Sequence, residues 1–509
     1  MSLMGLDIGT TGAKATIFSE DGGILAGAYR EYPLVHPQPG WSEIVPMQVW
    51  GLVREAVGEA AAAIPGDPVK AFAISTMGEA AVPVGPDGRV LGNSIITFDN
   101  RASDLFERWL AGVERAEIMR ISGQPPCQMF TLAKLMWIKQ HQPDLYRRMA
   151  RYPCFGDFAH MMMGLDARID YSMAARTMAF DIRRKQWSEQ VLGWADVRPD
   201  LFTPAAPTGT PVGELDRKAA GELGLPRGCL VVVGSHDQPA GALGCGVTRP
   251  RVAMDATGTV ECFAVAMDEP VVNRTMLDNN LPCYPHAARD LYVALAFNFT
   301  GGSLFRWVRD RLAQTEMAEA ERTGRDVYKL LTDHMSHEPT ELFVVPHFTM
   351  SGSPHMDPNP VGAVIGLQLN TTRPELLRAV LEGISYEMKL NLDLLLAAGA
   401  QVDEFRAVGG GAKSDFWLQL KADMFNRPVV RLEVAEAASL GMAVSAGVGA
   451  GIYQSAAATV ERFIAPRDRF LPDPKRAAYY DAKLAQYREL YPALKDWQRR
   501  VGFRRNAEG

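Results

Sequence analysis

The chain has 509 residues, more than a single hydrophobic core usually holds, so its length predicts at least two domains. Hydrophobic residues make up 47% of the chain and charged residues 22%, the balance of an ordinary globular protein. The net charge of -6 and the lack of a long basic block argue against nucleic acid as the main partner.

The first predicted elements are two short apolar strands joined by a tight turn, in LMGLDIGTTGAKATIF (3–18). A third strand is expected at 24–32 and an amphipathic helix at 46–64, where valines recur at helical spacing. The apolar run VKAFAIS (69–75) reads as a buried strand. Because a helix connects it to the first strand, we expect the two strands to run parallel.

The second half of the chain opens with the same pattern, RVAMDATGTVECFAVAM (251–267), in which an apolar run again ends in Asp, Gly and Thr. The two acids, Asp7 and Asp255, are 255 − 7 = 248 residues apart. Further expected elements are strands at 290–297, 341–346 and 404–411 and helices starting at 301 and at 374. A pattern that recurs at the length of a domain indicates duplication, and we expect domains at 1–245 and 246–509.

The first turn has the chemistry of a site for phosphate and magnesium. Consecutive backbone N–H groups in a Gly-rich turn bind phosphate oxygens, and Thr10, Thr11 and Lys14 add donors and a cation. Asp7 cannot contact phosphate directly, so its presence indicates a divalent cation between the two. An ordinary hairpin turn is the alternative, since Gly and Thr are common there. The second copy at 255–259 favours nucleotide binding.

These motifs resemble the FGGY carbohydrate kinase family, within the superfamily of actin, hexokinase and the heat-shock-70 ATPases. DIGTTGAK and DATGTVE resemble its two phosphate loops, AVGGGAKSDFWLQLKADMFNRPV its adenosine segment and VGSHDQPAGALGCG the segment with its catalytic aspartate. The resemblance implies an α/β fold of two duplicated ribonuclease-H-like (actin/hexokinase-type) domains with a central cleft. It also implies transfer of the γ-phosphoryl group of ATP, with Mg2+, to a hydroxyl of a sugar or polyol.

The resemblance gives each motif a role. Asp237 is the expected general base, although an Asp before a helix is also a common N-cap. Asp7, together with Asp237, is the expected contact to magnesium. The resemblance assigns ATP to residues of both halves, namely Asp7, Thr10, Thr11, Lys14, Thr257, Gly258, Thr259, Gly302, Gly410, Gly411, Ala412 and Ser414. Gly302 has a plain alternative as the first residue of a helix.

The acceptor is expected to contact the first domain, through Met77, Glu79, Asp99, Arg101 and Gln238. Arg101 has a structural ion pair as its alternative role. Gly78 stands where relatives carry His or Arg, so we expect a loosened pocket unless a distant residue fills the gap.

The runs DYSMAARTMAFD and FDIRRKQWSEQVL are most similar to xylulokinases, which makes a ketopentose such as D-xylulose, giving the 5-phosphate, the first expectation for the substrate. Other ketoses, deoxyketoses, polyols such as glycerol and aldonates such as gluconate stay open. An actin-like or heat-shock-70-like ATPase without a small acceptor is the alternative of a different class. The resemblance also allows a homodimer.

Cysteine usage and hydropathy bear on location. Six cysteines occur without a C-x-x-C pair, which favours reduced thiols over a zinc site or disulfides. No apolar run reaches the roughly 18 residues of a membrane span, and Asp7 close to the start argues against a secretory leader. We therefore expect a cytoplasmic protein with no membrane partner. The basic segment at 495–505 is expected to be a solvated tail.

Overall fold

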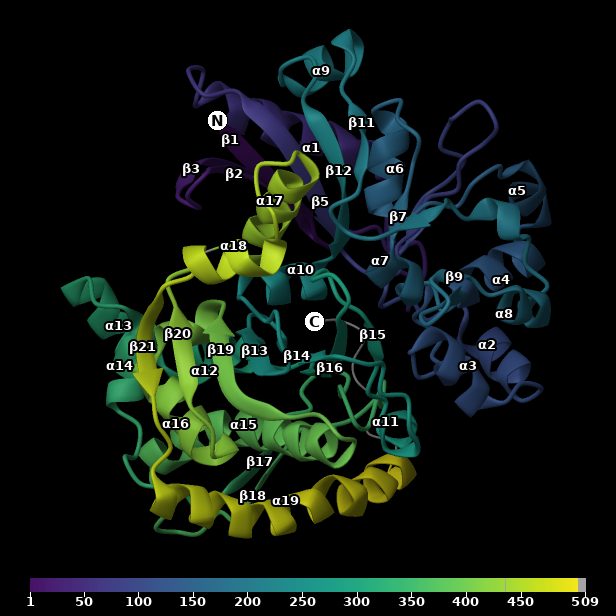
Figure 1. Cartoon of the computed structure of the whole chain (residues 1–509). Helices are drawn as coiled ribbons and strands as arrows, with labels where there is room; N and C mark the ends of the chain where they lie inside the picture. The colour runs from purple at the N-terminus through teal and green to yellow at the C-terminus, as the bar shows by residue number, and fades with distance from the viewer. Residues whose placement is uncertain (435, 502–509) are drawn as a thin grey trace.

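The computed structural model describes residues 1–434 and 436–501 and shows two α/β lobes (Figure 1). Elements from the first half of the chain build the upper lobe, and most elements of the second half build the lower one. Each lobe is centred on one large sheet.

The first sheet has six strands in the order β11-β12-β5-β1-β2-β3. As predicted, β1 and β2 form an antiparallel hairpin and β5 lies parallel to β1. Its strands are β1 (Ser2–Ile8), β2 (Gly12–Ser19), β3 (Ile24–Glu31), β5 (Val69–Thr76), β11 (Pro211–Glu214) and β12 (Leu230–His236).

The second sheet has seven strands in the order β15-β16-β14-β13-β19-β20-β21. Its strands are β13 (Arg251–Thr257), β14 (Glu261–Met267), β15 (Cys283–Pro285), β16 (Tyr292–Asn298), β19 (Val402–Val408), β20 (Val429–Leu432) and β21 (Pro466–Phe470). Short pairs elsewhere are β4 (Glu43–Ile44) with β6 (Ser94–Ile95), β7 (Ile169–Asp170) with β10 (Ala205–Ala206), β8 (Phe180–Asp181) with β9 (Gln186–Trp187), and β17 (Phe343–Val345) with β18 (Ala363–Ile365).

Five strands of each sheet share one topology. The order β3-β2-β1-β5-β12 in the first sheet corresponds to β16-β14-β13-β19-β20 in the second. In both, three antiparallel strands are followed by two strands parallel to the first. The duplication predicted from the two Asp-Gly-Thr patterns is therefore a duplication of the fold.

Helices cover both sheets. The first half carries α1 (Pro46–Ala62), α2 (Ser103–Leu110), α3 (Arg115–Ser122), α4 (Thr131–His141), α5 (Pro143–Arg148), α6 (Phe155–Met162), α7 (Tyr171–Arg176), α8 (Glu189–Ala195), α9 (Arg217–Leu223) and α10 (Asp237–Gly244). The second half carries α11 (Arg274–Asp278), α12 (Gly302–Leu312), α13 (Gln314–Thr323), α14 (Val327–Asp333), α15 (Arg373–Ala397), α16 (Asp415–Phe425), α17 (Ala437–Gly449), α18 (Ala456–Phe463) and α19 (Pro474–Val501). Two 3-10 turns complete the set, η1 (Pro199–Leu201) and η2 (Gly410–Lys413).

Helix α17 belongs to the second half of the chain but packs on the first sheet, against β1, β5 and β12, and along α10 (Figure 1). Small residues make this contact possible. A Cβ atom on Gly5 of β1 would lie 1.8 Å from the carbonyl oxygen of Ser439, and one on Gly244 would lie 1.8 Å from that of Ala437. The predicted boundary at 245/246 stays a prediction, and α17 shows that the packing does not follow chain order.

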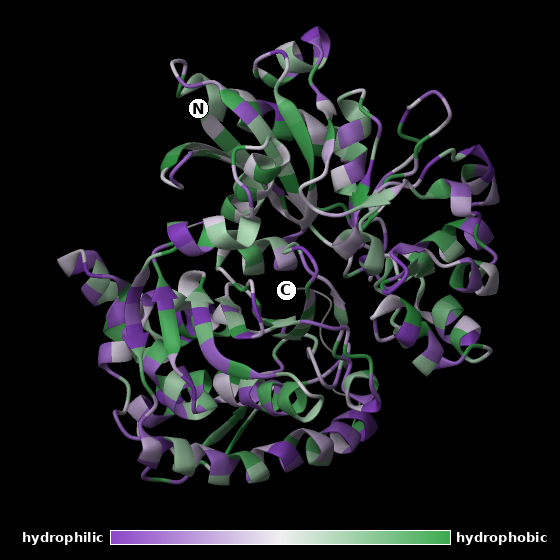
Figure 2. Ribbon diagram, viewed as in Figure 1, coloured by the Kyte–Doolittle hydropathy of each residue, from purple (hydrophilic) through white to green (hydrophobic). Residues whose placement is uncertain are grey.

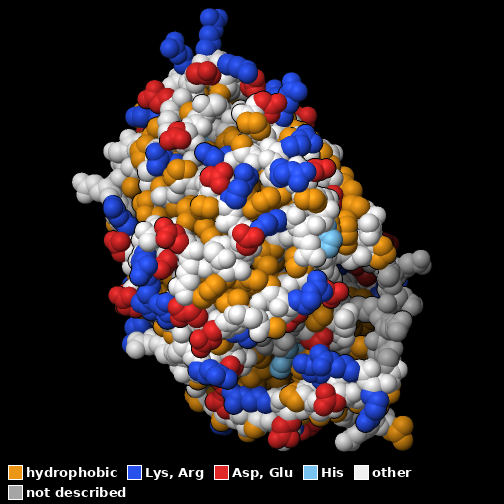
Figure 3. Space-filling model, turned by 90° about the vertical axis from the view of Figure 1, so that its right-hand side faces the viewer, with side chains coloured by type: hydrophobic (Ala, Val, Ile, Leu, Met, Phe, Trp, Pro, Cys, Tyr) orange, Lys and Arg blue, Asp and Glu red, His pale blue; other side chains and the backbone are white. Residues whose placement is uncertain are grey.

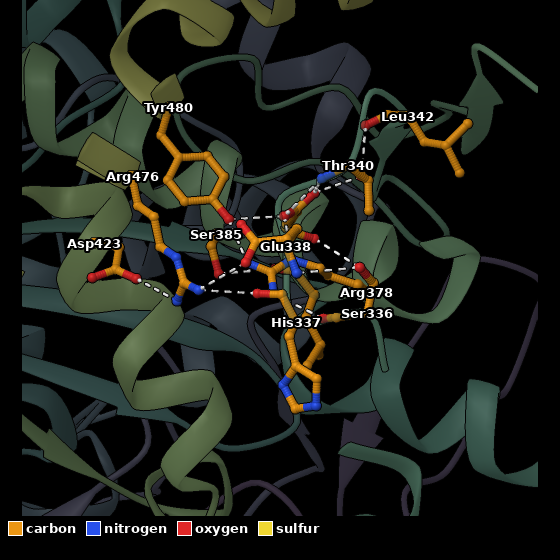
Figure 4. Close-up of polar contacts among 12 residues, drawn as sticks. Ser336, His337, Glu338, Thr340, Leu342, Arg378, Ser385, Asp423, Arg476 and Tyr480 are labelled. Carbon is orange, nitrogen blue, oxygen red and sulfur yellow. Dashed lines mark hydrogen bonds and ion pairs between the residues drawn. The ribbon is translucent and has the colours of Figure 1, made fainter. Parts of the chain in front are cut away.

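Helix α19 runs along the outer side of the lower lobe and is attached to α15 by buried polar groups (Figures 1 and 4). The hydroxyl of Tyr480 donates to Glu382 at 2.8 Å and accepts from Arg378 at 2.8 Å. Residues 495–501 form the end of this helix, and most of them are exposed, as expected of a solvated segment. The segment packs because Gln498 is buried against Val361. Residues 502–505 lie outside the described residues.

The strands are mostly apolar and the outer helices alternate between polar and apolar residues, which places the core between sheets and helices (Figure 2). The face at the right of Figure 1 carries acidic and basic side chains side by side, with apolar side chains grouped between them (Figure 3).

All six cysteines are free thiols. Within residues 1–434 and 436–501, no helix is long and apolar enough to cross a membrane.

Candidate active site

The first predicted phosphate loop is the turn between β1 and β2. Asp7 and Lys14 are directly opposite each other in this hairpin. The buried Tyr32 fixes the turn, because its hydroxyl donates to the carbonyl oxygen of Gly9 and its backbone N–H donates to that of Thr11 at 3.1 Å. Thr11 is exposed, and Gly9 and Thr10 are half-buried, so the turn is accessible from solvent.

The Asp7 carboxylate accepts a hydrogen bond from the hydroxyl of Ser75 on β5. Burial raises the pKa of Asp7 above its ordinary value, and the Ser75 bond and the Lys14 charge oppose that shift. The Lys14 ammonium lies 2.8 Å from the Glu436 carboxylate, at the N-terminus of α17. Both of these side chains are about one-third exposed, at 36% and 30%. The cation expected to hold phosphate is therefore paired with a carboxylate from the second half of the chain.

Asp237 is the first residue of α10, and His236 occupies the N-cap position. The alternative role of Asp237 as an N-cap is therefore wrong. Its Oδ1 atom is buried without a hydrogen-bonding partner, 3.1 Å from Nε2 of His236. Burial, followed by the negative charges of Asp7 and Glu79, raises the pKa of Asp237 to about 7. A carboxylate with such a pKa can accept a proton near neutral pH.

The second predicted phosphate loop, 257–259, docks on the N-terminus of α12. The backbone N–H of Gly302 donates to the carbonyl oxygen of Gly258 at 2.8 Å, and that of Ser303 donates to Thr259 at 3.1 Å. A Cβ atom on Gly302 would lie 2.5 Å from the same Gly258 oxygen. Gly302 is therefore both the first residue of a helix and a point of close approach to the loop.

A buried ion cluster lies behind this second loop. The Lys421 ammonium on α16 lies 2.7 Å from Asp255, 2.9 Å from Glu261 and 2.6 Å from the hydroxyl of Thr257. Burial lowers the pKa of Lys421, but the two carboxylates raise it more, and the net shift is upward. The acid of the second Asp-Gly-Thr pattern thus binds a lysine, whereas Asp7 in the first pattern binds a hydroxyl.

The predicted adenosine segment joins β19 to α16. Gly410, Gly411 and Ala412 form the 3-10 turn η2 with Lys413, and the Ser414 hydroxyl caps α16 by accepting from Trp417 N–H at 3.3 Å. A Cβ atom on Gly411 would lie 2.6 Å from that of Thr257. The structure therefore brings this segment against the second phosphate loop.

The acceptor residues separate into two groups. Glu79 forms a buried ion pair with Arg176, the last residue of α7, and both lie beside Gly78. Met77 is buried, and Gln238 follows Asp237 on α10 with Oε1 unpaired. The gap expected at Gly78 is filled, because a Cβ there would lie 3.0 Å from His236 Nε2 and 3.4 Å from Arg176 Nε.

Asp99 and Arg101 bind each other instead of facing an open pocket. The Arg101 guanidinium lies 2.8 Å from Asp99 and 2.7 Å from Glu43, and stacks 3.9 Å from the ring centre of Trp41. Asp99 also accepts from the backbone N–H of Ser42 at 2.6 Å. A role for this pair in binding the acceptor stays a prediction, and its geometry favours the alternative of a structural ion pair.

The residues present fit magnesium held largely by phosphate oxygens and water. Asp7 and the unpaired Oδ1 of Asp237 offer carboxylate oxygens, which Mg2+ prefers. No group of three or more His, Cys, Asp or Glu residues forms a metal cage in the part of the chain that the structure describes. A nucleotide-bound Mg2+ is usually held by one or two carboxylates and the phosphates.

Two lobes of one topology, each with a Gly- and Thr-containing turn after its first strand, define the actin- and hexokinase-like class of ATP-using proteins. Models of the FGGY family of carbohydrate kinases match residues 2–244 with the N-terminal domain and residues 253–450 with the C-terminal domain. The chain therefore belongs to the FGGY family of carbohydrate kinases. As a sugar kinase, it uses ATP and a small-molecule acceptor.

The relatives agree on the family and differ in substrate. A xylulose kinase from Staphylococcus epidermidis is 26% identical over 495 residues, covering 97% of each chain. An autoinducer-2 kinase from Salmonella typhimurium is 30% identical over 503 residues, covering 96% of this chain and 94% of that protein. The solved xylulose kinase from Lactobacillus acidophilus shares the fold, with a TM-score of 0.89 and 23% identity over 97% of this chain and 98% of its own.

Proposed function

We propose that the chain transfers the γ-phosphoryl group of magnesium-bound ATP to the terminal hydroxyl of a ketose, with a ketopentose such as D-xylulose as the first candidate. The observation that carries this proposal is the half-buried Asp237 carboxylate beside the Arg176–Glu79 pair, whose Oδ1 atom is buried and makes no hydrogen bond. The similarity to a xylulose kinase supports the ketopentose. Because 26% identity leaves the acceptor open, other ketoses, polyols and aldonates are tested beside it.

In the proposed reaction, Asp237 accepts the proton of the acceptor hydroxyl. The hydroxyl oxygen forms a bond to the γ-phosphorus, the bond from that phosphorus to the bridging oxygen breaks, and ADP leaves. Negative charge on Asp7 and Glu79 keeps Asp237 basic enough to take this proton near neutral pH.

The nucleotide is proposed to contact both lobes. Thr10, Thr11 and Lys14 would hold the transferring phosphates, and Thr257, Gly258 and Thr259 would face them from the second lobe. Asp7 and Asp237 would hold magnesium, which would neutralise charge on the phosphate oxygens. The adenosine would lie on Gly302, Gly410, Gly411, Ala412 and Ser414, where small residues permit close approach of the ligand.

An ATPase that acts without a small acceptor is the candidate of a different class. Such a protein would hydrolyse ATP at a rate that no sugar changes, whereas a kinase responds steeply to its acceptor. A coupled ADP-release assay with ketoses, aldoses, polyols and aldonates separates the two classes. Identification of the phosphorylated product by mass spectrometry then establishes the acceptor.

The matched variants Asp237→Asn and Asp144→Asn test the base, because Asp144 is an exposed residue of α5. We expect Asp237→Asn to lower kcat by roughly 10²-fold or more with little change in the KM for ATP. The Asp144 variant should match the parent. Near-normal turnover by Asp237→Asn would show that Asp237 is not the base.

A further inference from the structure

Buried polar atoms without a hydrogen-bonding partner gather beside the proposed base. They are Nε2 of Gln124, Nε of Arg176, Oδ1 of Asp237 and Oε1 of Gln238, and of these Oδ1 of Asp237 has an ion-pair contact to His236. An unsatisfied buried polar group destabilises the folded state, so several in one place indicate a site built for a polar ligand.

Direct contacts join these residues into one site. The Arg176 guanidinium pairs with Glu79 and donates to Oε1 of Gln124 at 3.3 Å. The Arg176 Nε atom is 3.4 Å from the position of a Cβ on Gly78, and His236 Nε2 is 3.0 Å from that position. His236 in turn lies 3.1 Å from Oδ1 of Asp237. These contacts connect Gln124, through Arg176 and the space beside Gly78, to His236 and the base.

The site is rigid because α7 is fixed at both ends. At its N-terminus, Asp170 accepts from Ser172 N–H at 2.6 Å, and the Ser172 hydroxyl accepts from His236 N–H at 3.0 Å. At its C-terminus, the Arg176 guanidinium lies 4.9 Å from the ring centre of Phe130, and its side chain is only 9% exposed. Polar groups held in this way discriminate between ligands, because they cannot move to form hydrogen bonds with other partners when a ligand lacks the matching group.

We propose that Arg176 and Gln124 determine acceptor specificity, donating hydrogen bonds to the carbonyl and hydroxyl oxygens of a neutral sugar. This proposal rests on the proposed function and names the class of its acceptor. The donors come from α7 and from the loop after α3, and together they replace the side chain that Gly78 lacks. Glu79 and Gln238 supply matching acceptors for the hydroxyl hydrogens of the sugar.

The charges around Gly78 favour a neutral acceptor over an aldonate. The positive charge of Arg176 is already paired with Glu79, and Asp237 adds a further carboxylate. Lys134 is a second cation here, but its ammonium donates to the carbonyl oxygen of Glu79 at 3.3 Å. A carboxylate on the acceptor would therefore find both cations already bound and would face the Asp237 carboxylate, and like charges at close range disfavour each other. A neutral ketose meets no such repulsion and uses the same unpaired donors and acceptors.

The test compares Gln124→Leu with the matched control Gln140→Leu, since Gln140 is exposed on α4. We expect Gln124→Leu to lower kcat/KM for the best neutral sugar roughly 10- to 100-fold, because an unpaired buried partner remains. The KM for ATP should stay within about twofold of the parent, which a general loss of structure would not allow. The Gln140 variant should match the parent.

A second variant, Arg176→Lys, keeps a positive charge beside Glu79 but removes the Nε donor. We expect the same selective loss of sugar kcat/KM, with the KM for ATP and the far-ultraviolet circular dichroism unchanged. D-xylulose, xylitol and D-gluconate serve as acceptor probes for all variants. A parent that prefers gluconate, or Gln124 and Arg176 variants with unchanged sugar kinetics, overturns the proposal while leaving the kinase assignment intact. A parent that phosphorylates no sugar overturns both.

Discussion

Lys421 is the residue whose replacement best tests the architecture of the second phosphate loop. Its ammonium contacts Asp255, Glu261 and Thr257 at 2.7, 2.9 and 2.6 Å, and the side chains of Lys421 and both carboxylates are at most 1% exposed. Lys421→Met keeps the length and much of the volume of the side chain but removes its charge and its donors. Both carboxylates are then buried without their cation.

The expected loss of stability follows from this burial. Removing one partner of a buried ion pair costs about 3–5 kcal/mol, because an uncompensated charge remains. At about 2–4 °C per kcal/mol for a lobe of some 250 residues, the thermal transition should fall by roughly 6–20 °C. Burial already raises the pKa of Glu261 to about 8 in the parent, against the opposing charge of Lys421, and loss of that charge raises this pKa further. The native state of the variant then binds more protons than that of the parent, so the loss should shrink as the pH falls through 8.

Differential scanning calorimetry measures both effects, with Lys475→Met as the matched control because Lys475 is exposed. The double variant Lys421→Met/Glu261→Gln should recover part of the loss, since one buried charge is removed. The KM for ATP should also rise, because Thr257 loses its donor. A transition within about 2 °C of the parent at pH 8, with no dependence on pH, would refute the reasoning.

Three more predictions concern single groups. Asp237 has a pKa of about 7 and must be ionised to act as a base. When both substrates are well below their KM values, activity should therefore fall about tenfold per pH unit below roughly pH 7. A level profile down to pH 5 would contradict this. Lys14→Ala should raise the KM for ATP roughly tenfold, whereas Glu436→Gln should lower it by freeing Lys14; a rise in both variants would disprove the competition. Tyr480→Phe should cost about 1–3 kcal/mol in urea unfolding, because Arg378 and Glu382 lose a buried partner, and an unchanged midpoint would count against the cluster in Figure 4.

The sequence alone predicted the elements that depend on local pattern. The hairpin of β1 and β2 follows from two apolar runs around a Gly-rich turn, and the parallel pairing of β5 follows from the helix between the strands. The duplicated topology follows from the recurring Asp-Gly-Thr pattern. These features need only neighbouring residues or a repeat within the chain.

Contacts between distant residues could not be predicted in this way. Lys421 occupies a helix where charged residues are usually exposed, and its partners Asp255 and Glu261 precede it by more than 150 residues. Arg176 and Gly78 meet because α7 packs against β12, the neighbour of β5 in the sheet, and Gly78 follows β5. The sequence contained one indication of this contact, which was Gly78 at a position where relatives carry His or Arg. That glycine meant either that a side chain from elsewhere fills the gap or that the acceptor pocket is wider than in the relatives.

The position of α17 limits how the chain can be divided. A fragment ending near residue 245 would carry all six strands of the first sheet but would lack the helix that covers β1, β5 and β12. The apolar residues under α17, including Leu3, Ala73 and Val232, would then face water. Such a fragment should aggregate when expressed alone and regain solubility when the remaining chain is supplied in trans. The two halves share a topology, yet each is expected to need the other in order to fold. A split-protein reporter built at this junction would therefore report their reassembly.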